Sequence, residues 1–288
     1  TEDSAKDFVT KLIGLTHYST LEHGTIYLKY RAEYDVEAHS WNIPQNFFPF
    51  FFDRNPYSKV VKIESEDMCN WYITTSLRVI IENNLQECLQ YVCEPTELHE
   101  RRITARFTCC RAISHELVRH RKLSFSQESQ RYVGYDKERF GGEVTFVKPH
   151  WYDEEFPACL TWIESLKESE KKYLELREAG LKPQDARGVL PNATKTEIVV
   201  TGFESDWEHF FSLRSPKYGA QGVHPDCAKL ADELYEKILN IVVIQKKYRD
   251  KNFSAKELAK ELGTNTRYIS AVINSRFNTN FSCLINEY

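Results

Sequence analysis

Cationic and hydrogen-bonding side chains are concentrated in residues 119–132, which read RHRKLSFSQESQRY. The stretch opens with Arg119, His120 and Arg121, continues through serines, glutamines and one glutamate, and reaches Arg131. Guanidinium groups bind phosphate through paired, charge-assisted hydrogen bonds, so this composition is typical of an anion site. A simpler explanation is that the cations complement the negative end of a helix dipole.

Two more arginines lie in apolar surroundings, Arg187 in ARGVLP and Arg214 in FFSLRSP. An unpaired guanidinium is unfavourable in such an environment, so each one needs a counter-charge. A phosphorylated ligand would supply it. The residues alone therefore predict a site for a nucleotide or dinucleotide, and a structural network of salt bridges is the alternative.

The periodicity around these residues predicts the elements that position them. Apolar and polar residues alternate over 101–110, as in a strand, and the period becomes helical over 111–122. We therefore expect Arg119, His120 and Arg121 at the C-terminal end of a helix, and the polar run after them to be extended.

The remaining pattern predicts a mixed α/β or α+β body. Residues 32–70 show no clear period and are expected to be irregular. Helices are expected over 3–15, 71–92, 153–179, 204–214 and 226–248, a short helix between Pro183 and Pro191, and strands around 26–31 and over 196–203.

Composition limits the class of protein. The net charge of −4 gives no global basic field, so an anion site must be local. The longest apolar run, 47–52, is too short to span a bilayer, and no charged-then-apolar leader opens the sequence, so we expect a cytoplasmic protein with no membrane partner. The eight cysteines form no CxxC pair, which favours reduced thiols, and we expect no metal site.

One spacing resembles a known signature. Arg-His-Arg at 119–121, seven residues, and then Ser129-Gln130-Arg131-Tyr132 resembles the signature of the flavin-dependent thymidylate synthases. Further resemblances to that family are HYSTLEH at 17–23, SHELVRHR at 114–121, ARGVLP at 186–191, and FFSLR followed by His224-Pro225. The resemblance extends over residues 3–240.

The resemblance implies an α+β fold with a central sheet flanked by helices, and a homotetramer with active sites shared between subunits. It implies the reductive methylation of dUMP to dTMP, with methylenetetrahydrofolate as carbon donor and FAD, reduced by NADPH, as hydride carrier. Arg214 would lie against the pyrimidine and favour its form ionised at N3, which makes C5 more nucleophilic.

The resemblance also assigns binding residues. Ser129 is expected to donate a hydrogen bond rather than act as a nucleophile, because no general base is placed beside it. The substrate positions are Glu116, Leu117, Val118, Arg119, Gln127, Glu128, Ser129, Gln130, Arg131 and Arg187, with Arg131 and Arg187 as phosphate ligands. The flavin positions are Ser19, Arg119, His120, Arg121, Gln127, Phe203, Glu204, Ser205 and His209.

Several residues depart from the family pattern. Glu116 stands where many relatives have Gln, and its charge needs a partner such as Arg111. Phe203, Ser205 and His209 stand where others carry Asn and Arg, so the contacts to the adenine and pyrophosphate must be rebuilt.

The C-terminal residues have a second character. We expect a catalytic domain over 1–244 and an appendage over 245–288, in which 253–288 resembles one helix-turn-helix unit of AraC-type regulators. Residues 246–288 carry eight Lys/Arg and four Asp/Glu. A structural appendage is favoured over DNA binding, because no second unit follows. Two alternatives for the whole chain are a nucleotide-sensing DNA-binding regulator and a related pyrimidine-nucleotide hydroxymethylase.

Overall fold

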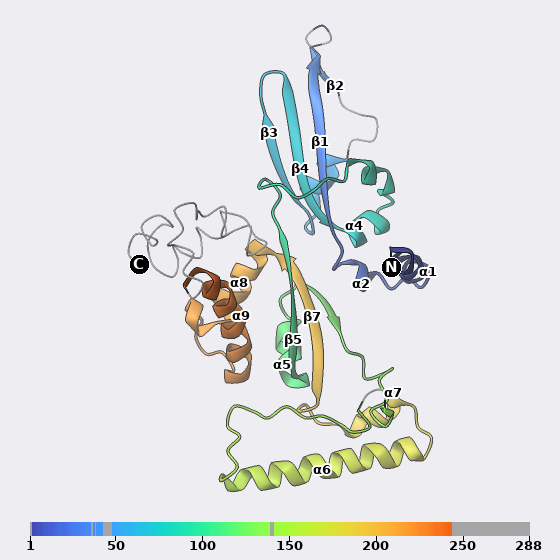
Figure 1. Cartoon of the computed structure of the whole chain (residues 1–288), viewed down its shortest axis with the longest axis vertical. Helices are drawn as coiled ribbons and strands as arrows, with labels where there is room; N and C mark the ends of the chain where they lie inside the picture. The colour runs from blue at the N-terminus through green and yellow to red at the C-terminus, as the bar shows by residue number, and fades with distance from the viewer. Residues whose placement is uncertain (1, 36, 38, 43–47, 139–140, 244–288) are drawn as a thin grey trace.

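Two antiparallel sheets follow one another along the long axis of the molecule (Figure 1). The strand order is β2-β1-β4-β3 in the first sheet and β5-β7-β6 in the second. The structure is a computed structural model that describes residues 2–35, 37, 39–42, 48–138 and 141–243. The appendage expected at 245–288, with its helix-turn-helix pattern, lies outside these residues.

The four-stranded sheet is built on alternation along its two central strands. In β1 (Thr25–Asp35) the side chains of Leu28, Tyr30 and Ala32 are buried and their neighbours face outward. β4 (Met68–Ser76) pairs with β1 and buries Trp71 and Ile73 beside them. The other elements of this half are α1 (Glu2–Gly14), α2 (Tyr18–Leu21), β2 (Ser40–Asn42), α3 (Pro49–Arg54), β3 (Lys59–Glu64), α4 (Leu77–Glu82) and the 3₁₀ helix η1 (Gln86–Tyr91).

Two sequence expectations are wrong in this half. Residues 32–70 are not irregular, because they contain β2, α3 and β3 and the ends of β1 and β4. Residues 71–92 are not one helix, because they begin inside β4. The Ser76 side chain accepts a hydrogen bond from the backbone N–H of Val79, so the helix starts only after Ser76.

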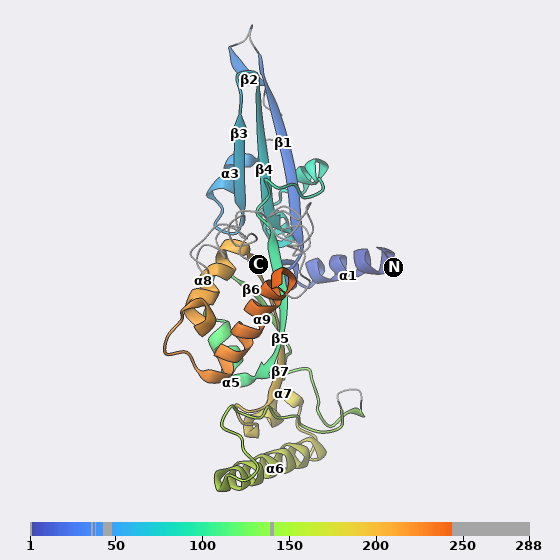
Figure 2. The same ribbon diagram turned by 60° about the vertical axis from the view of Figure 1, so that its left-hand side comes forward.

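The three-stranded sheet contains part of the segment 119–132, as strand β6, and packs against several helices. β7 (Lys195–Phe203) is the central strand, with β5 (Arg102–Cys110) on one side and β6 (Ser124–Gln127) on the other. α8 (Glu204–Arg214) buries Trp207, Phe210 and Phe211 against this sheet. α9 (Pro225–Val243) packs beside α8 and α5 (Figure 2). The 3₁₀ helix η4 (Pro216–Tyr218) connects α8 to α9.

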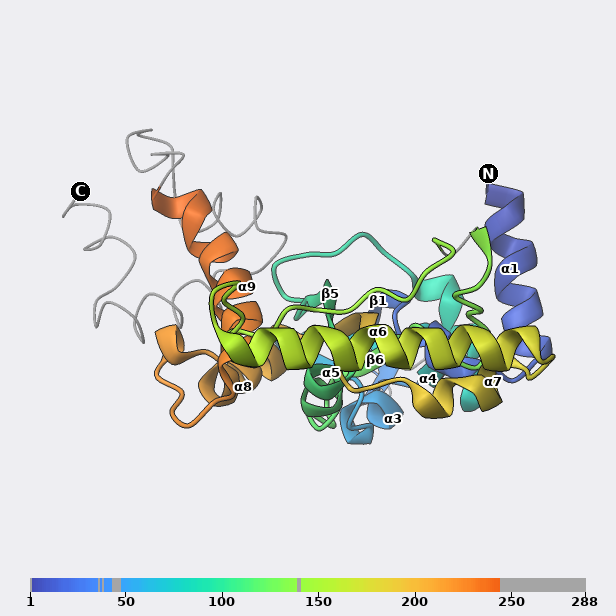
Figure 3. The same cartoon turned by 90° about the horizontal axis from the view of Figure 1, so that it is seen from below.

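A long helix crosses the lower end of the molecule (Figure 3). This is α6 (Pro157–Glu178), followed by α7 (Pro183–Ala186) and the 3₁₀ helix η3 (Arg187–Val189). The expected end of this helix at residue 179 is close to the observed one, because the helix ends at Glu178 and Gly180 follows with a φ of +90°. This lobe has its own small core, formed by Tyr135, Val144, Tyr173 and Ala186.

The predicted α+β class is confirmed, although the described residues form two sheets rather than one central sheet. α5 (Arg111–Leu117) is shorter than expected: Arg119, His120 and Arg121 follow its last turn instead of lying within it. The extended segment after them is confirmed as β6. No described helix is both long and apolar enough to cross a bilayer.

Candidate active site

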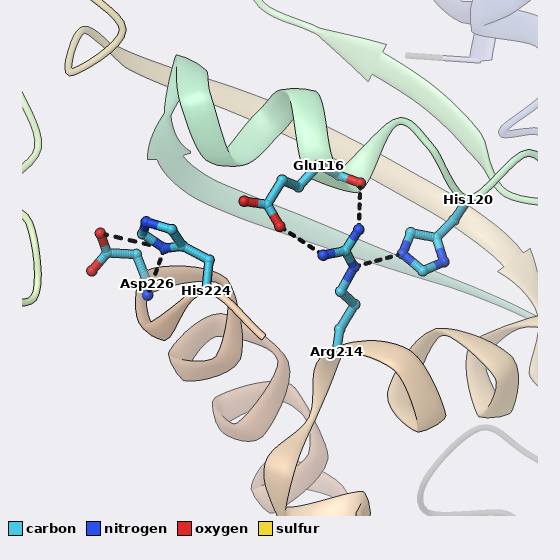
Figure 4. Close-up of polar contacts among 5 residues, drawn as sticks. All are labelled: Glu116, His120, Arg214, His224 and Asp226. Atoms are coloured by element: carbon cyan, nitrogen blue, oxygen red, sulfur yellow. Dashed lines mark hydrogen bonds and ion pairs between the residues drawn. The ribbon is translucent and has the colours of Figure 1, made fainter. Parts of the chain in front are cut away.

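The end of α5 and the end of α8 meet at Arg214 (Figure 4). Arg214 Nη1 donates to Glu116 Oε2 at 2.6 Å, and Nη2 donates to the Glu116 backbone oxygen at 3.3 Å. Nε donates to His120 Nε2 at 3.0 Å. The Arg214 and Glu116 side chains are 18% and 24% exposed, so the pair is largely shielded from water but open on one side. At least three of the five guanidinium N–H groups are therefore directed at the segment 116–120.

His120 is a hydrogen-bond acceptor in this arrangement. Arginine is only a donor, so Nε2 of His120 carries the lone pair and its proton is on Nδ1. Burial, the positive charge of Arg214 and the neighbouring His209 lower the pKa of His120 to about 4. The ring packs edge-on against Phe210, with 4.9 Å between the ring centroids. His120 is therefore neutral at physiological pH and positions Arg214 rather than transferring protons.

The backbone that carries Arg214 is fixed from α9. Ser215 Oγ donates to Asp232 Oδ1 at 2.5 Å, and the backbone N–H of Lys217 donates to the same oxygen at 3.1 Å. Cys227 is fully buried next to Arg214, and burial raises the pKa of its thiol to about 11. The thiol stays protonated, so Cys227 contributes packing and no nucleophile.

Glu116 has a different partner from the one expected. Arg111 does not neutralise it, because Arg111 Nη1 donates to the backbone oxygen of Glu128 at 3.1 Å and to Thr196 Oγ1 at 3.4 Å. The counter-charge of Glu116 is Arg214, 98 residues away along the chain. The carboxylate thus neutralises the guanidinium and accepts from one of its five N–H groups.

The last residue of β6, Gln127, and the segment that follows it are held by hydrogen bonds within the chain. Gln127 Nε2 donates to Ser114 Oγ at 2.8 Å and to Thr196 Oγ1 at 3.2 Å. Ser129 Oγ accepts from the backbone N–H of Arg131 at 3.3 Å. These bonds fix the backbone from which the exposed Arg131 side chain projects.

Arg131 and Arg187 are not among the contacts of Arg214 in this chain. The Arg131 guanidinium lies over the ring of Tyr132, at 5.5 Å from its centroid. Arg187 Nε donates to the backbone oxygen of Gln184 at 3.2 Å, in the lobe of α6 and α7. The structure thus brings Glu116, His120 and Arg214 into contact, and neither of the two expected phosphate ligands is part of that cluster.

Three cations and two carboxylates, those of Glu22 and Glu82, line a small cavity between the two sheets. The cavity has a volume of about 110 Å³ and is lined by Arg78, Arg102, Lys122, Ser124 and Phe203, among others. Nη1 and Nη2 of Arg102 donate to Thr25 and Ser124 at 3.4 Å, but its buried Nε has no partner among the described residues. The buried Nε2 of the nearby motif residue His23 also has none. Burial lowers the pKa of both groups.

The other expected flavin positions differ in exposure. Phe203 and Glu204 are 4% and 2% exposed, whereas Ser19, Arg121 and His209 are exposed. Ser205 is also exposed and is bound through both its backbone N–H and its hydroxyl to Glu100 Oε1. Among the substrate positions, Val118 and Arg119 are exposed, Glu128 is half-buried, Gln130 is 9% exposed, and the Leu117 side chain is 1% exposed in the core. Leu117 therefore packs in the core beneath the site and does not face a ligand.

Sequence reasoning missed Arg102, Lys122 and Cys227. The signal for Arg102 was present, because a charged residue that opens an alternating strand needs a partner or a ligand. Two residues of the motif at 17–23 also have partners elsewhere in the chain: Glu22 accepts from Arg78 at 2.6 Å, and His23 Nδ1 is 2.7 Å from the Thr201 hydroxyl.

The chain is similar to proteins of one known family. A model of the family described as thymidylate synthase complementing protein, Thy1, matches residues 82–242, which is more than half of the chain. A flavin-dependent thymidylate synthase of Thermococcus kodakarensis is 34% identical over 154 residues, which cover 54% of this chain and 62% of the relative. The enzymes of that name from Pyrococcus furiosus and Mycobacterium tuberculosis are each 40% identical over 106 and 117 residues, which cover 37% and 38% of this chain and 43% and 47% of theirs.

The chain therefore matches between 43% and 62% of the length of these relatives. Among solved structures, a UMP/dUMP methylase, PolB from Streptomyces cacaoi bound with 5-Br dUMP, superimposes with a TM-score of 0.39 and 21% identity. That alignment covers 47% of this chain and 66% of the other.

Proposed function

The chain belongs to the thymidylate synthase complementing protein family, and we propose that it is a flavin-dependent thymidylate synthase. The proposed reaction converts dUMP to dTMP. Methylenetetrahydrofolate supplies the one-carbon group and is released as tetrahydrofolate. NADPH and one proton supply the reducing equivalents. The uracil loses the proton on C5. The names of the relatives and the matched family support this reaction class.

The observation that carries the proposal is the Arg214 guanidinium at the junction of α5 and α8. A positive charge that is shielded from water on most sides interacts strongly with nearby charge, because little solvent screens it. It is also fixed in advance by Glu116 and His120, so little reorganisation is needed when a ligand binds. Placed against a uracil, such a group stabilises the form ionised at N3 and increases the electron density at C5.

Glu116 tunes this effect. Its carboxylate forms an ion pair with Arg214 at 2.6 Å. A uracil that ionises beside Arg214 introduces a second negative charge, so the carboxylate and the base compete for one cation. Glu116 therefore limits the ionisation of the base relative to a neutral side chain at the same position.

His120 has a positioning role. Because its pKa is about 4, it is a weak base and carries no proton on Nε2 for donation at neutral pH. Its contribution is to orient Arg214 through Nε2 and to leave the Nδ1–H available to a flavin or nucleotide oxygen. The proton lost from C5 is not assigned to this imidazole.

The residues near Phe203 fit a flavin dinucleotide in part. When bound, FAD would carry the hydride from NADPH to the transferred carbon. Arg102 and Lys122 would hold a phosphate, and the unpartnered Nε of Arg102 is a donor suited to a phosphate oxygen. Arg78 is already paired with Glu22 and Glu82 in the same cavity. A cavity of about 110 Å³ takes a phosphate group but is smaller than usual ligand pockets, so the flavin ring would need further walls.

A second subunit would supply those walls. Arg131 and Arg187, the proposed phosphate ligands of dUMP, lie outside the Arg214 cluster in one chain. We propose that they complete the site of a neighbouring copy in a homotetramer. The seven described cysteines are free thiols, in agreement with the cytoplasmic location that we propose.

The test is a turnover assay of the purified full-length chain with dUMP, methylenetetrahydrofolate, FAD and NADPH. Its products are resolved by mass. We expect dTMP, and no product when FAD is left out. A hydroxymethylated nucleotide, or a product from dCMP alone, would instead support the hydroxymethylase. A colourless protein that takes up no FAD and forms no product would contradict the proposal.

A further inference from the structure

Two histidines and an aspartate meet away from Arg214, at the start of α9. His150 lies in the loop that leads to α6, and His224 and Asp226 flank the first residue of α9. His150 Nδ1 is 3.6 Å from Asp226 Oδ1, and His224 Nδ1 is 4.0 Å from Asp226 Oδ2. Figure 4 shows the His224 ring next to Asp226 at the end of the helix. Segments 74 residues apart thus direct three potential metal ligands at one point.

The three side chains have the donor atoms and spacing of a metal site. Each offers one ligand atom, and these atoms all lie within 4.8 Å of one another. Ligands of a tetrahedral zinc ion at about 2.0–2.2 Å from the metal are roughly 3.4 Å apart, so adjustments of about 1 Å would complete the site. The side chains are 43%, 46% and 23% exposed, so they have room for that movement.

The local structure already orients the histidines. The backbone N–H of Asp226 donates to His224 Nδ1 at 3.2 Å, which holds that ring at the helix start. The two imidazole rings are nearly perpendicular, at 88°, with 5.6 Å between their centroids.

We propose that His150, His224 and Asp226 bind a divalent first-row transition-metal ion, with zinc as the ion of choice for two imidazoles and one carboxylate. Three protein ligands leave at least one coordination position open. A cavity of about 670 Å³ adjoins the cluster and is lined by Trp151, Tyr152 and Trp162, among others. Water or a small ligand in this cavity can occupy the open position.

The ion would connect two parts of the fold. His150 precedes Trp151 and Tyr152, whose rings pack edge-on against Trp162 of α6. Asp226 belongs to α9, which packs on α8 and α5. A metal bridge would therefore tie the lobe of α6 to the helix that anchors the Arg214 segment. We expected no metal site from the sequence, because the three residues form no ligand-spacing motif along the chain.

The test is zinc binding to the full-length chain after chelator treatment, followed by isothermal titration calorimetry. We expect one zinc ion per chain with micromolar or tighter affinity. His150→Ala and Asp226→Ala should each weaken binding roughly tenfold or more, because each removes one of three ligands. His115→Ala removes an exposed histidine outside the cluster and should bind zinc like the unmodified chain.

Two further readouts make the outcome independent of enzyme activity. Cobalt(II) at the same site should quench the fluorescence of the adjacent Trp151, and His150→Ala should abolish this quenching. Zinc should raise the melting temperature of the unmodified chain and not that of Asp226→Ala. The proposal is overturned if zinc fails to bind, or if the two ligand variants, folded by circular dichroism, bind zinc as tightly as His115→Ala.

Discussion

Replacement of Arg214 by alanine tests the proposed activation of the base. The change removes a guanidinium that makes bonds of 2.6 Å to Glu116 and 3.0 Å to His120. If that charge stabilises the ionised uracil, its loss should lower kcat by about 10²- to 10³-fold, the range measured when one preorganised donor is removed. This corresponds to about 2.7–4 kcal/mol of transition-state stabilisation.

The same change has a limited effect on folding. It leaves a largely shielded carboxylate and the acceptor Nε2 of His120 without their partner, which costs about 1–3 kcal/mol. For a chain of this size that lowers the melting temperature by only several degrees. It should also raise the pKa of His120, since the charge of Arg214 is one cause of its depression.

The assay is dTMP formation under saturating cofactor, with urea unfolding measured in parallel. Arg106→Ala is the matched control, because Arg106 is 71% exposed and makes only a 3.8 Å contact with Glu197. The control should keep its activity. An Arg214→Ala protein that is folded and turns over within threefold of the unmodified chain would remove Arg214 from the mechanism.

Three other outcomes are expected. The pKa of His120 is about 4 in the folded protein, below its ordinary 6.5, so its contribution to the free energy of unfolding is full above pH 6.5 and is lost as the pH falls towards 4. His120→Gln should therefore flatten the dependence of the free energy of unfolding on pH between 4 and 6.5, measured by urea unfolding. An unchanged slope would contradict the assignment. Gly202→Ala places a Cβ against the buried side chain of Leu123 and should destabilise the protein by about 1–3 kcal/mol in urea unfolding. The Cβ of the control Gly188→Ala meets no atom within 4 Å, so this variant should unfold like the unmodified chain. Equal effects would argue against the packing around β7. Arg102→Met should weaken FAD binding, measured by flavin fluorescence, because it removes a cation that lines the cavity. The control Arg106→Met, on the same strand, should bind FAD like the unmodified chain. Equal affinities of the two variants would exclude the cavity as a phosphate site.

Local patterns predicted the elements of the three-stranded half well. The helix expected at 204–214 matches α8 to the residue, because Trp207, Phe210 and Phe211 recur at helical spacing and all three are buried. The strands around 101–110 and 196–203 are confirmed as β5 and β7. In these segments the apolar residues recur along the sequence at the same spacing as the buried residues recur in the structure.

The four-stranded half shows why the period can mislead. From residue 73 onward β4 buries consecutive residues, including Thr74 and Thr75, so its alternation disappears where it runs into α4. A run without alternation is compatible with a buried helix as well as with a buried strand. The segment 71–92 was therefore predicted as one helix, when it is the end of a strand, a short helix and a 3₁₀ turn.

The candidate site depended on contacts that no local pattern contains. Arg214 was singled out by its apolar neighbours, but its pairing with Glu116 spans 98 residues and depends on how α5 and α8 pack. The neutral state of His120 likewise follows from burial and from that guanidinium. The sequence could identify the residue types needed for anion binding, and only the packing shows which charges face each other.

The most direct test of the central claim is the ionisation state of the bound base. dUMP labelled with ¹⁵N at N3 and bound to the full-length chain with FAD would be observed by NMR at neutral pH. If Arg214 stabilises the ionised base, the one-bond N–H coupling is lost in the unmodified protein and retained when Arg214→Ala binds the same nucleotide. A coupling that persists in the unmodified protein would show that the bound uracil stays neutral, and Arg214 would then have no role in ionising it.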